Sequence, residues 1–178
     1  MDFKEITDLA RGSVRQRQAY ALLKRTKILL RLEQFCPVLV GTVPLAIDIE
    51  SSDLDIICCF TVPEQFKKKL IDEFGSAQDF ELQIPKRIKP PAIVARFVEA
   101  GFEVEIFGQG TPIKDQFAYR HLKVEHALLK RRGPAFRQQI VDLKRQGLKT
   151  EPAFAQALGL TGDPYTALLE LEEENERF

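Results

Sequence analysis

Two aspartates separated by a single residue, Asp53 and Asp55, are the first side chains in this sequence that could do chemistry. They begin an apolar run that is typical of a strand, and alternate side chains of a strand project from the same face. Two carboxylates on one face repel each other, and each raises the pKa of the other unless a cation neutralises them. Mg²⁺, or Mn²⁺ in its place, suits such a pair because hard cations take carboxylate oxygens together with substrate phosphates. We therefore predict that Asp53 and Asp55 bind a divalent metal.

A glycine–threonine pair, Gly41 and Thr42, precedes the aspartates and is separated from Asp53 by ten residues. The short apolar run before it predicts a buried strand that ends at Gly41. Gly41 has no side chain, so the backbone there can approach a ligand closely. Thr42 offers a hydroxyl and a backbone amide, and both can form hydrogen bonds with a phosphate oxygen. We therefore expect this pair to contact a phosphate group of the substrate.

A third carboxylate is expected from a neighbouring strand, because in-line phosphoryl transfer favours two metals held about 3.5–4 Å apart. The run from Phe102 to Phe107 alternates in polarity, so Glu103 and Glu105 share one face of a predicted strand. We predict Glu105 as the third metal ligand and as a catalytic carboxylate, because it lies beside the more apolar end of the run. Glu103 is the alternative, and its position nearer the turn favours a solvated side chain.

The rest of the sequence predicts the elements that position these residues. Ser13 and Gln16 have the form of a capping box, which predicts a helix from Ser13 to Phe35 that Pro37 ends. A compact turn at residues 99–101 predicts an antiparallel hairpin between the strands that flank it. Further strands are predicted over 38–40, 53–60, 80–84, 93–98 and 102–107, and further helices over 61–75, 117–130, 134–146, 152–158 and from 163 onward.

This order of elements predicts an α+β fold in which a mixed β-sheet has flanking helices and the C-terminal half is helical. A length of 178 residues favours one domain. We expect residues 1–111 to form an α/β core. Residues 112–178 are expected to form a helical part that packs on this core, so that the chain is a single compact unit.

Two other regions carry cations that could meet a phosphate. The loop over residues 85–91 is basic and rich in proline, so it could contact a triphosphate or act as a lid. A solvated surface loop is the other interpretation of this segment. Arg120 and His121 open the helical half and could reach the site, although an exposed ion pair explains Arg120 equally well.

Composition limits the classes of partner. Lys and Arg together number 26, as do Asp and Glu, so the formal net charge is zero, which argues mildly against a long nucleic acid. Charged residues interrupt every apolar run before it could cross a bilayer, and no secretory signal is evident at the start of the sequence. The three cysteines lack the spacing of a disulfide framework or a zinc site. We therefore predict a cytoplasmic protein with reduced thiols and no membrane partner.

The combination of Gly41-Thr42, a ten-residue gap and Asp53-Leu54-Asp55 resembles the signature of the nucleotidyltransferase superfamily, which includes polymerase beta and the antibiotic nucleotidyltransferases. The resemblance implies the polymerase-beta-like fold and an incoming nucleoside triphosphate that Gly41 and Thr42 contact. It also implies that Asp53, Asp55 and a later carboxylate, matched here by Glu105, bind the metals. The sequence departs from the superfamily pattern in having threonine for the usual serine, and glutamate for the commoner third aspartate.

More narrowly, the chain resembles a bacterial family known as domain of unknown function 4269. The resemblance extends from the first strand to the last helix and implies a shared fold over most of the chain. The segments that carry it are GTVPLAIDIESSDLDIIC, EIFGQ, QFAYRHLKVE and KTEPAFAQALGLTGDPYTALL.

These resemblances imply a Mg²⁺-dependent protein that transfers a nucleotidyl group from a nucleoside triphosphate to an acceptor. The acceptor hydroxyl would be deprotonated by a metal-coordinated base or by a carboxylate, for which Glu105 is the candidate. The sequence leaves open whether the acceptor is a small molecule, a protein or RNA, and it does not indicate the oligomeric state. A catalytically inactive module that binds a nucleotide or a metal is the alternative, and a hydrolase or phosphotransferase that uses the same carboxylates is a third reading of the site.

Overall fold

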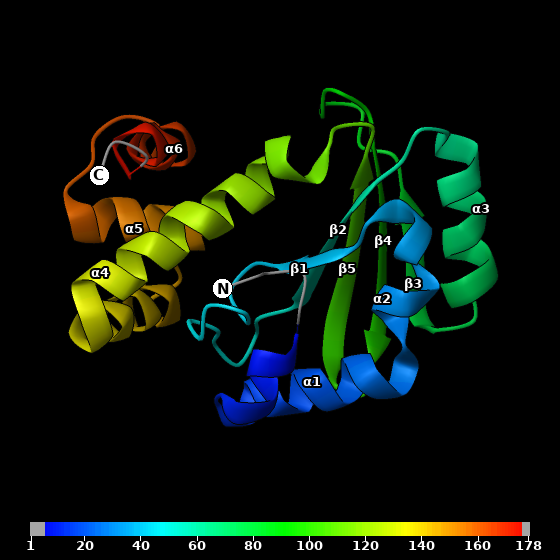
Figure 1. The fold of residues 1–178 in the computed structure, drawn as a ribbon, viewed down its shortest axis with the longest axis horizontal. Helices are drawn as coiled ribbons and strands as arrows, with labels where there is room; N and C mark the ends of the chain where they lie inside the picture. Colours follow the sequence, from blue (N-terminus) through cyan, green and yellow to red (C-terminus); the bar gives the residue numbers. More distant parts are fainter. Residues whose placement is uncertain (1–5, 176–178) are drawn as a thin grey trace.

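The computed structural model describes residues 6–175 and places five strands in one sheet (Figure 1). The strands lie in the order β1-β2-β5-β4-β3. Only β2 and β5 run parallel among the neighbouring strands of the described chain, and the other neighbours are antiparallel. The sheet is therefore mixed, as the sequence predicted. The strands are β1 (Val38–Val40), β2 (Leu54–Cys59), β3 (Gln78–Gln83), β4 (Ala92–Glu99) and β5 (Phe102–Gln109).

The first helix begins as predicted but ends early. The Ser13 hydroxyl accepts a bond of 3.1 Å from the Gln16 amide, and the Ser13 amide donates to the Gln16 side chain at 2.9 Å, so the capping box is formed. The prediction of one helix through to Phe35 is wrong, because Lys27 takes a left-handed conformation with φ of 54°. This break redirects the chain and buries Ile28, which is 1% exposed. The segment instead forms α1 (Val14–Thr26), α2 (Ile28–Arg31) and a short 3-10 turn (Glu33–Phe35).

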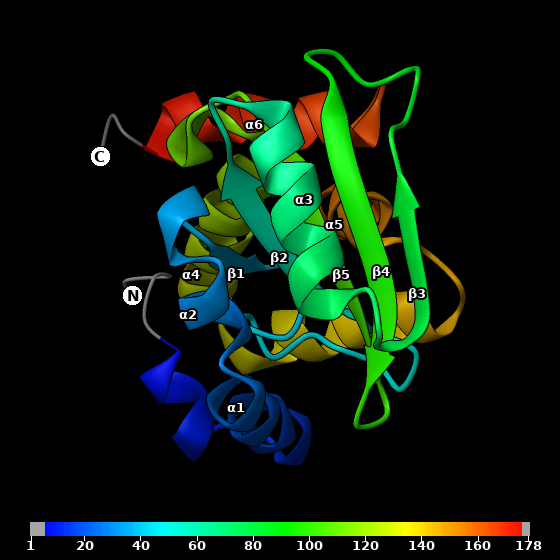
Figure 2. The same cartoon turned by 90° about the vertical axis from the view of Figure 1, so that its right-hand side faces the viewer.

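One face of the sheet is covered by α1, α2 and α3 (Pro63–Phe74), which lie beside it in both views (Figures 1 and 2). The apolar side chains of these helices meet the inward side chains of β2, β4 and β5 in one hydrophobic core. Two rings stack at its edge, Phe74 and Phe97, with centroids 5.1 Å apart. The core includes Leu22, Leu23, Ile28, Leu54, Ile56, Phe66, Leu70, Ile93, Val104 and Ile106.

The opposite face of β1 and β2 packs against the helical C-terminal half, which consists of α4 (Phe117–Arg145), α5 (Thr150–Leu158) and α6 (Pro164–Asn175). The helices predicted on either side of Gly133 are both present as the two segments of α4, which meet at a kink where Gly133 is non-helical, with φ of 81° and ψ of −168°. None of the described helices is at once long enough and apolar enough to cross a membrane. This second core includes Val38, Val40, Ile57, Leu122, Leu129, Phe136, Ile140, Phe154 and Leu168.

Candidate functional site

The register of the sheet brings two of the predicted carboxylates together. Asp55 on β2 is paired with Val40 of β1 on one side and with Glu105 of β5 on the other. Because β2 and β5 are parallel and in this register, Asp55 and Glu105 project from the same face on neighbouring strands. Glu103 is exposed and pairs with Val98 nearer the hairpin turn. Glu105 is therefore the carboxylate of β5 that lies beside Asp55.

Gly41 lies against the carboxylate of Asp55. Its φ is +73°, and a Cβ added there would overlap Oδ2 of Asp55 and stand 3.1 Å from its Cγ. Both the backbone conformation and the lack of space therefore require glycine at this position. Thr42 is 9% exposed, and its carbonyl accepts bonds of 3.2 Å from the amides of Leu45 and Ile47. The predicted phosphate-contacting pair thus borders one of the predicted metal ligands, Asp55.

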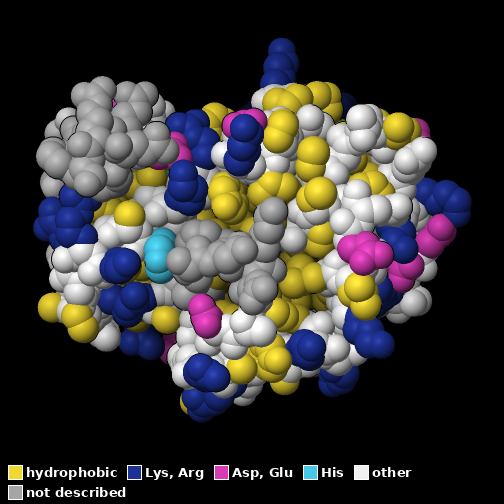
Figure 3. Space-filling model, in the orientation of Figure 1, with side chains coloured by type: hydrophobic (Ala, Val, Ile, Leu, Met, Phe, Trp, Pro, Cys, Tyr) yellow, Lys and Arg dark blue, Asp and Glu magenta, His cyan; other side chains and the backbone are white. Residues whose placement is uncertain are grey.

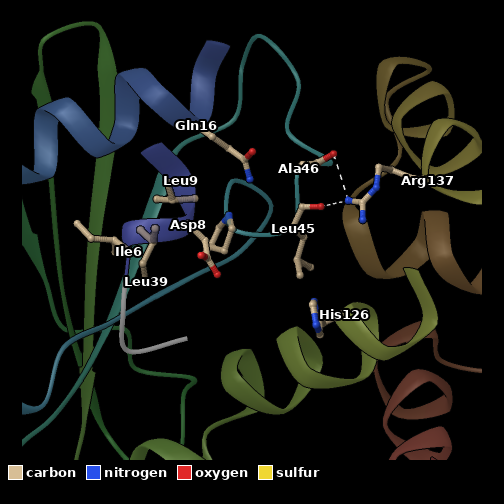
Figure 4. A pocket seen from close by; sticks show the side chains of 10 residues that line it. Ile6, Asp8, Leu9, Gln16, Leu39, Leu45, Ala46, His126 and Arg137 are labelled. Atoms are coloured by element: carbon tan, nitrogen blue, oxygen red, sulfur yellow. Dashed lines mark hydrogen bonds between the residues drawn. The ribbon is translucent and has the colours of Figure 1, made fainter. Parts of the chain in front are cut away.

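The loop that joins Thr42 to Asp53 is held through its backbone carbonyls by side chains of α1 and α4. We call this segment, residues 41–53, the clamped loop. Gln16 from α1 and Arg137 from α4 approach it from opposite sides (Figure 4). Such bonds from side chains to backbone satisfy the buried carbonyl groups of an irregular segment. The bonds are Gln16 to Val43 at 2.8 Å, Arg137 to Leu45, Lys144 to Ile47 at 3.0 Å and Arg15 to Ser52 at 2.5 Å.

Asp55 has the most perturbed acid–base behaviour among the three predicted carboxylates. Burial, followed by the negative charges of Asp53 and Glu105, raises the pKa of Asp55 to about 8. The charge of Glu151 raises this pKa further, and the positive charge of Lys144 lowers it. Among the described residues, no side chain forms a hydrogen bond or an ion pair with the Asp55 carboxylate. A bound cation would therefore stabilise the ionised form of the Asp55 carboxylate.

The candidate ligands fit Mg²⁺ or Mn²⁺, because each of them offers carboxylate oxygens, which are hard donors. The absence of a side chain at Gly41 leaves the backbone there open beside the Asp55 carboxylate. The carboxylates are nevertheless not assembled around an ion position. Within residues 6–175, no three His, Cys, Asp or Glu side chains converge closely enough to hold a metal. Glu105 forms an ion pair with Arg96 on β4, its partner in the register. Glu105 could bind a metal only after its ion pair with Arg96 breaks.

The helical half contributes buried charged groups that sequence reasoning missed. Glu125 is 3% exposed and Lys144 is 6% exposed, although both lie on α4. Burial, followed by the charge of Glu151, raises the pKa of Glu125 well above its usual range. No local pattern distinguishes Lys144 from the other lysines of its helix. Arg96 was detectable, because it is the single cation of β4 and apolar residues flank it from Ala92 to Val98.

Arg120 and His121 have partners other than the three predicted carboxylates. Arg120 pairs with Glu172 at 2.8 Å, which supports the ion-pair interpretation. His121 is 6% exposed, and a ring nitrogen lies 3.5 Å from Glu151. The basic loop over residues 84–91 joins β3 to β4 at the end of β5 that holds Gln109, away from Glu105.

A separate cavity of about 190 Å³ lies between α1, the clamped loop and α4 (Figure 4). Asp8, Gln16, His126 and Arg137 contribute its polar groups, and Leu39 and Leu45 contribute part of its apolar wall. None of the three predicted carboxylates lines it. The cavity therefore adds nothing to the metal chemistry, although the Arg137 and Gln16 bonds that close it also hold the clamped loop.

The chain belongs to the family Domain of unknown function (DUF4269), which matches residues 21–171. No curated protein shows significant sequence similarity to it. A structure of Cid1 described by its RNA terminal uridylyl transferase activity aligns with 74% of this chain and 41% of that chain, at 14% identity and a TM-score of 0.55. A Cid1 poly(U) polymerase mutant bound to MgATP covers 80% and 48%, at 17% identity and a TM-score of 0.54.

A cytoplasmic RNA terminal U-transferase also matches, over 74% of this chain and 39% of that chain, at 18% identity and a TM-score of 0.50. The chain thus spans less than half the length of these structures. At such identities the likeness shows the fold alone. The chain has the nucleotidyltransferase fold, as the sequence predicted.

Proposed function

We propose that this protein is a Mg²⁺-dependent nucleotidyltransferase that transfers a nucleotidyl group from a nucleoside triphosphate to an acceptor hydroxyl. The observation that carries the proposal is the register of β2 and β5, which sets Asp55 beside Glu105 with the backbone of Gly41 against the Asp55 carboxylate. A fold shared with structures described as bound to MgATP or to a UTP analogue supports the same chemistry. A cytoplasmic location and the division into residues 1–111 and 112–178 are parts of this proposal.

In this proposal Asp53 and Asp55 hold the metal, and Glu105 joins them when it leaves Arg96. When bound, Mg²⁺ supplies the positive charge that offsets the developing charge on the phosphates. Gly41 and Thr42 bind the β- and γ-phosphates through backbone amides and the Thr42 hydroxyl. The hydrogen bonds that hold the clamped loop keep these groups in place before the substrate arrives, which reduces reorganisation in the transition state.

Glu105 is the proposed base that takes the proton of the acceptor hydroxyl, which then attacks the α-phosphorus. The exchange of Arg96 from Glu105 to a phosphate oxygen would free the carboxylate and place a cation on the substrate. The triphosphate charge therefore favours the same rearrangement that Glu105 needs for its role. Substitution of Arg96 by Gln would test this step through a loss of triphosphate affinity.

The acceptor remains a choice between a small molecule, a protein and RNA. The matched structures are described as polymerases or transferases of uridylyl groups on RNA, which favours RNA as the first acceptor to test. Lys and Arg side chains are scattered over the face seen in Figure 3 and do not gather in one patch. That distribution, together with zero net charge, favours a short acceptor over a long polyanion.

Product analysis tests the proposal directly. The chain is incubated with each α-labelled nucleoside triphosphate, Mg²⁺ or Mn²⁺, and an RNA oligonucleotide or a pool of small hydroxyl compounds. Label transfer with pyrophosphate release, abolished in Asp53→Asn and Asp55→Asn, is the expected result. Release of phosphate without transfer would identify a hydrolase in place of a nucleotidyltransferase.

A non-catalytic module that binds a nucleotide or a metal is the second candidate. The Arg96–Glu105 ion pair favours it, because that pair occupies the third carboxylate. Substitution of Glu105 by Gln separates the two candidates. A binding module would retain nucleotide affinity in this variant and show no turnover in the native chain, whereas the transferase would lose turnover.

A further inference from the structure

Lys144, near the end of α4, directs its ammonium inward to the backbone of the clamped loop. The residue is 6% exposed, and Nζ donates a bond of 3.0 Å to the carbonyl of Ile47 in the clamped loop. A lysine is rarely buried so deeply without anionic partners. The carboxylates that interact electrostatically with this ammonium are Glu125, Asp48, Asp53 and Asp55.

The neighbouring cations are engaged elsewhere. Arg15 donates to the Ser52 carbonyl and lies over the ring of Phe102, 4.2 Å from its centroid. Arg96 is paired with Glu105. Lys144 is therefore the cation best placed to offset the charge of the two aspartates.

We infer that Lys144 is a positioning residue, an internal cation that ties the clamped loop and supplies positive charge to the pair Asp53 and Asp55 before a metal binds. The inference rests on the proposed function, since it takes these aspartates as the metal ligands. The metal then competes with an ammonium that is already present, so the charge of Lys144 lowers the affinity for the metal. This arrangement allows the site to fold without a bound ion.

The buried Glu125 is a second polar group of α4 that interacts electrostatically with Lys144. Glu125 lies before the kink at Gly133 and Lys144 lies after it. The Ile47 carbonyl is the group that accepts the hydrogen bond of the ammonium. The adjacent Arg145 also reaches the clamped loop, but it is exposed and pairs with the exposed side chain of Glu50 at 3.1 Å.

The affinity for Mn²⁺ alone, measured on the full chain by electron paramagnetic resonance, tests this role. Lys144→Gln should bind Mn²⁺ about tenfold more tightly than the native chain, which corresponds to about 1.4 kcal/mol. Lys144→Arg keeps the charge and should stay within about twofold of the native value. Arg145→Gln removes one positive charge from the next residue and is the matched control, again expected within about twofold. Equal or weaker binding by Lys144→Gln would overturn the inference, because a purely structural tie predicts a loosened site.

If no chain binds Mn²⁺, that result counts against the proposed function. A double-mutant cycle without metal still tests the role of Lys144 in that case. Lys144→Gln should lower the thermal midpoint by about 4 °C in the native background. In the Asp53→Asn/Asp55→Asn background the same substitution should lower it by less than half as much. An equal loss in both backgrounds would overturn the role of Lys144 as a counter-cation, whatever the metal affinity.

Discussion

The clamped loop between β1 and β2 and the basic loop between β3 and β4 both join antiparallel neighbours, but the protein holds them in different ways. In the clamped loop, the carbonyls of Val43, Leu45 and Ile47 each accept a bond from a side chain of α1 or α4. The basic loop, residues 84–91, is largely exposed, and its described tie to another element is a bond of 2.8 Å from Gln109 to Pro90. Hydrogen bonds from two helices therefore hold the backbone of the clamped loop, whereas most of the basic loop faces solvent.

The fixed loop is the one that carries Gly41 and Thr42 and leads to the two aspartates. A site for an anionic substrate and a metal gains from this rigidity, because the binding groups need little reorganisation. The basic loop has more cations, yet it leads into Ala92, which pairs with Gln109 at the end of β5, whereas Glu105 lies in the middle of that strand. Charge in the sequence is therefore a poorer guide to the site than the hydrogen bonds that hold a segment in place.

The largest effect is expected at Asp55, which lies beside Gly41 of the clamped loop. Its pKa is about 8 in the folded chain, above the ordinary value of 3.8, so the folded state retains a proton that the unfolded state has lost. Without metal, the free energy of unfolding should therefore fall as the pH rises from about 4 to about 8, by up to about 1.4 kcal/mol per pH unit. Urea unfolding across this range measures the slope. Asp55→Asn should reduce this slope, leaving the part that Glu125 contributes through its own raised pKa, and should be the more stable chain at pH 8. An unchanged slope would contradict the account.

The next effect is expected at the start of the clamped loop. Gly41→Ala imposes a side chain on a φ of +73° and displaces the Asp55 carboxylate, so it should destabilise the chain by about 3 kcal/mol. Gly101→Ala is the matched control, because Gly101 has a φ of +79° and no atom within 4 Å of an added Cβ. The control should cost about 1 kcal/mol. Equal losses in the two variants would show that Gly41 has no close contact with Asp55.

A third change removes one of the side chains that hold the clamped loop. Arg137→Met deletes the bonds to the carbonyls of Leu45 and Ala46 and should lower the free energy of unfolding by about 2 kcal/mol. Arg17→Met is its control, since Arg17 donates to the Gly12 carbonyl at 2.6 Å in an exposed position. That variant should lie within about 0.5 kcal/mol of the native chain. If both variants unfold at the same denaturant concentration, the loop is not held as described.

The smallest effect is expected in the basic loop. The triple substitution Lys86→Ala/Arg87→Ala/Lys89→Ala removes exposed charges and should change the free energy of unfolding by less than about 0.5 kcal/mol. Nucleoside triphosphate affinity should change by less than about threefold at 0.15 M salt, because these cations are exposed to solvent and salt screens exposed charges. Equilibrium binding of a fluorescent triphosphate measures it. A tenfold loss of affinity would show that this loop contacts the triphosphate.

Local patterns in the sequence predicted much of the sheet and of the site. The alternation around Asp55 and Glu105 indicated two strands with carboxylates on one face, and the Ser13 capping box marked the start of α1. Both features depend on residues close together in the chain. The left-handed break at Lys27 was missed, because the same apolar stripe continues on both sides of it.

The parts that sequence reasoning did not find depend on contacts between distant residues. Lys144 reaches Ile47 across 97 positions of the chain, and no local pattern marks it as buried. The Arg96–Glu105 ion pair depends on the register of β4 and β5, which the sequence does not state. Whether Asp53, Asp55 and Glu105 bind metal stays a prediction.

Thermal unfolding with each nucleoside triphosphate, with and without Mg²⁺, tests the central claim most directly. The native chain is compared with Asp53→Asn/Asp55→Asn at ligand concentrations about a hundred times the dissociation constant, where binding adds about 2.7 kcal/mol. The account predicts a rise of about 5–10 °C in the midpoint that needs both Mg²⁺ and triphosphate and is absent in the double variant. No shift with any triphosphate, or an equal shift in the double variant, would contradict a nucleotide site at these carboxylates.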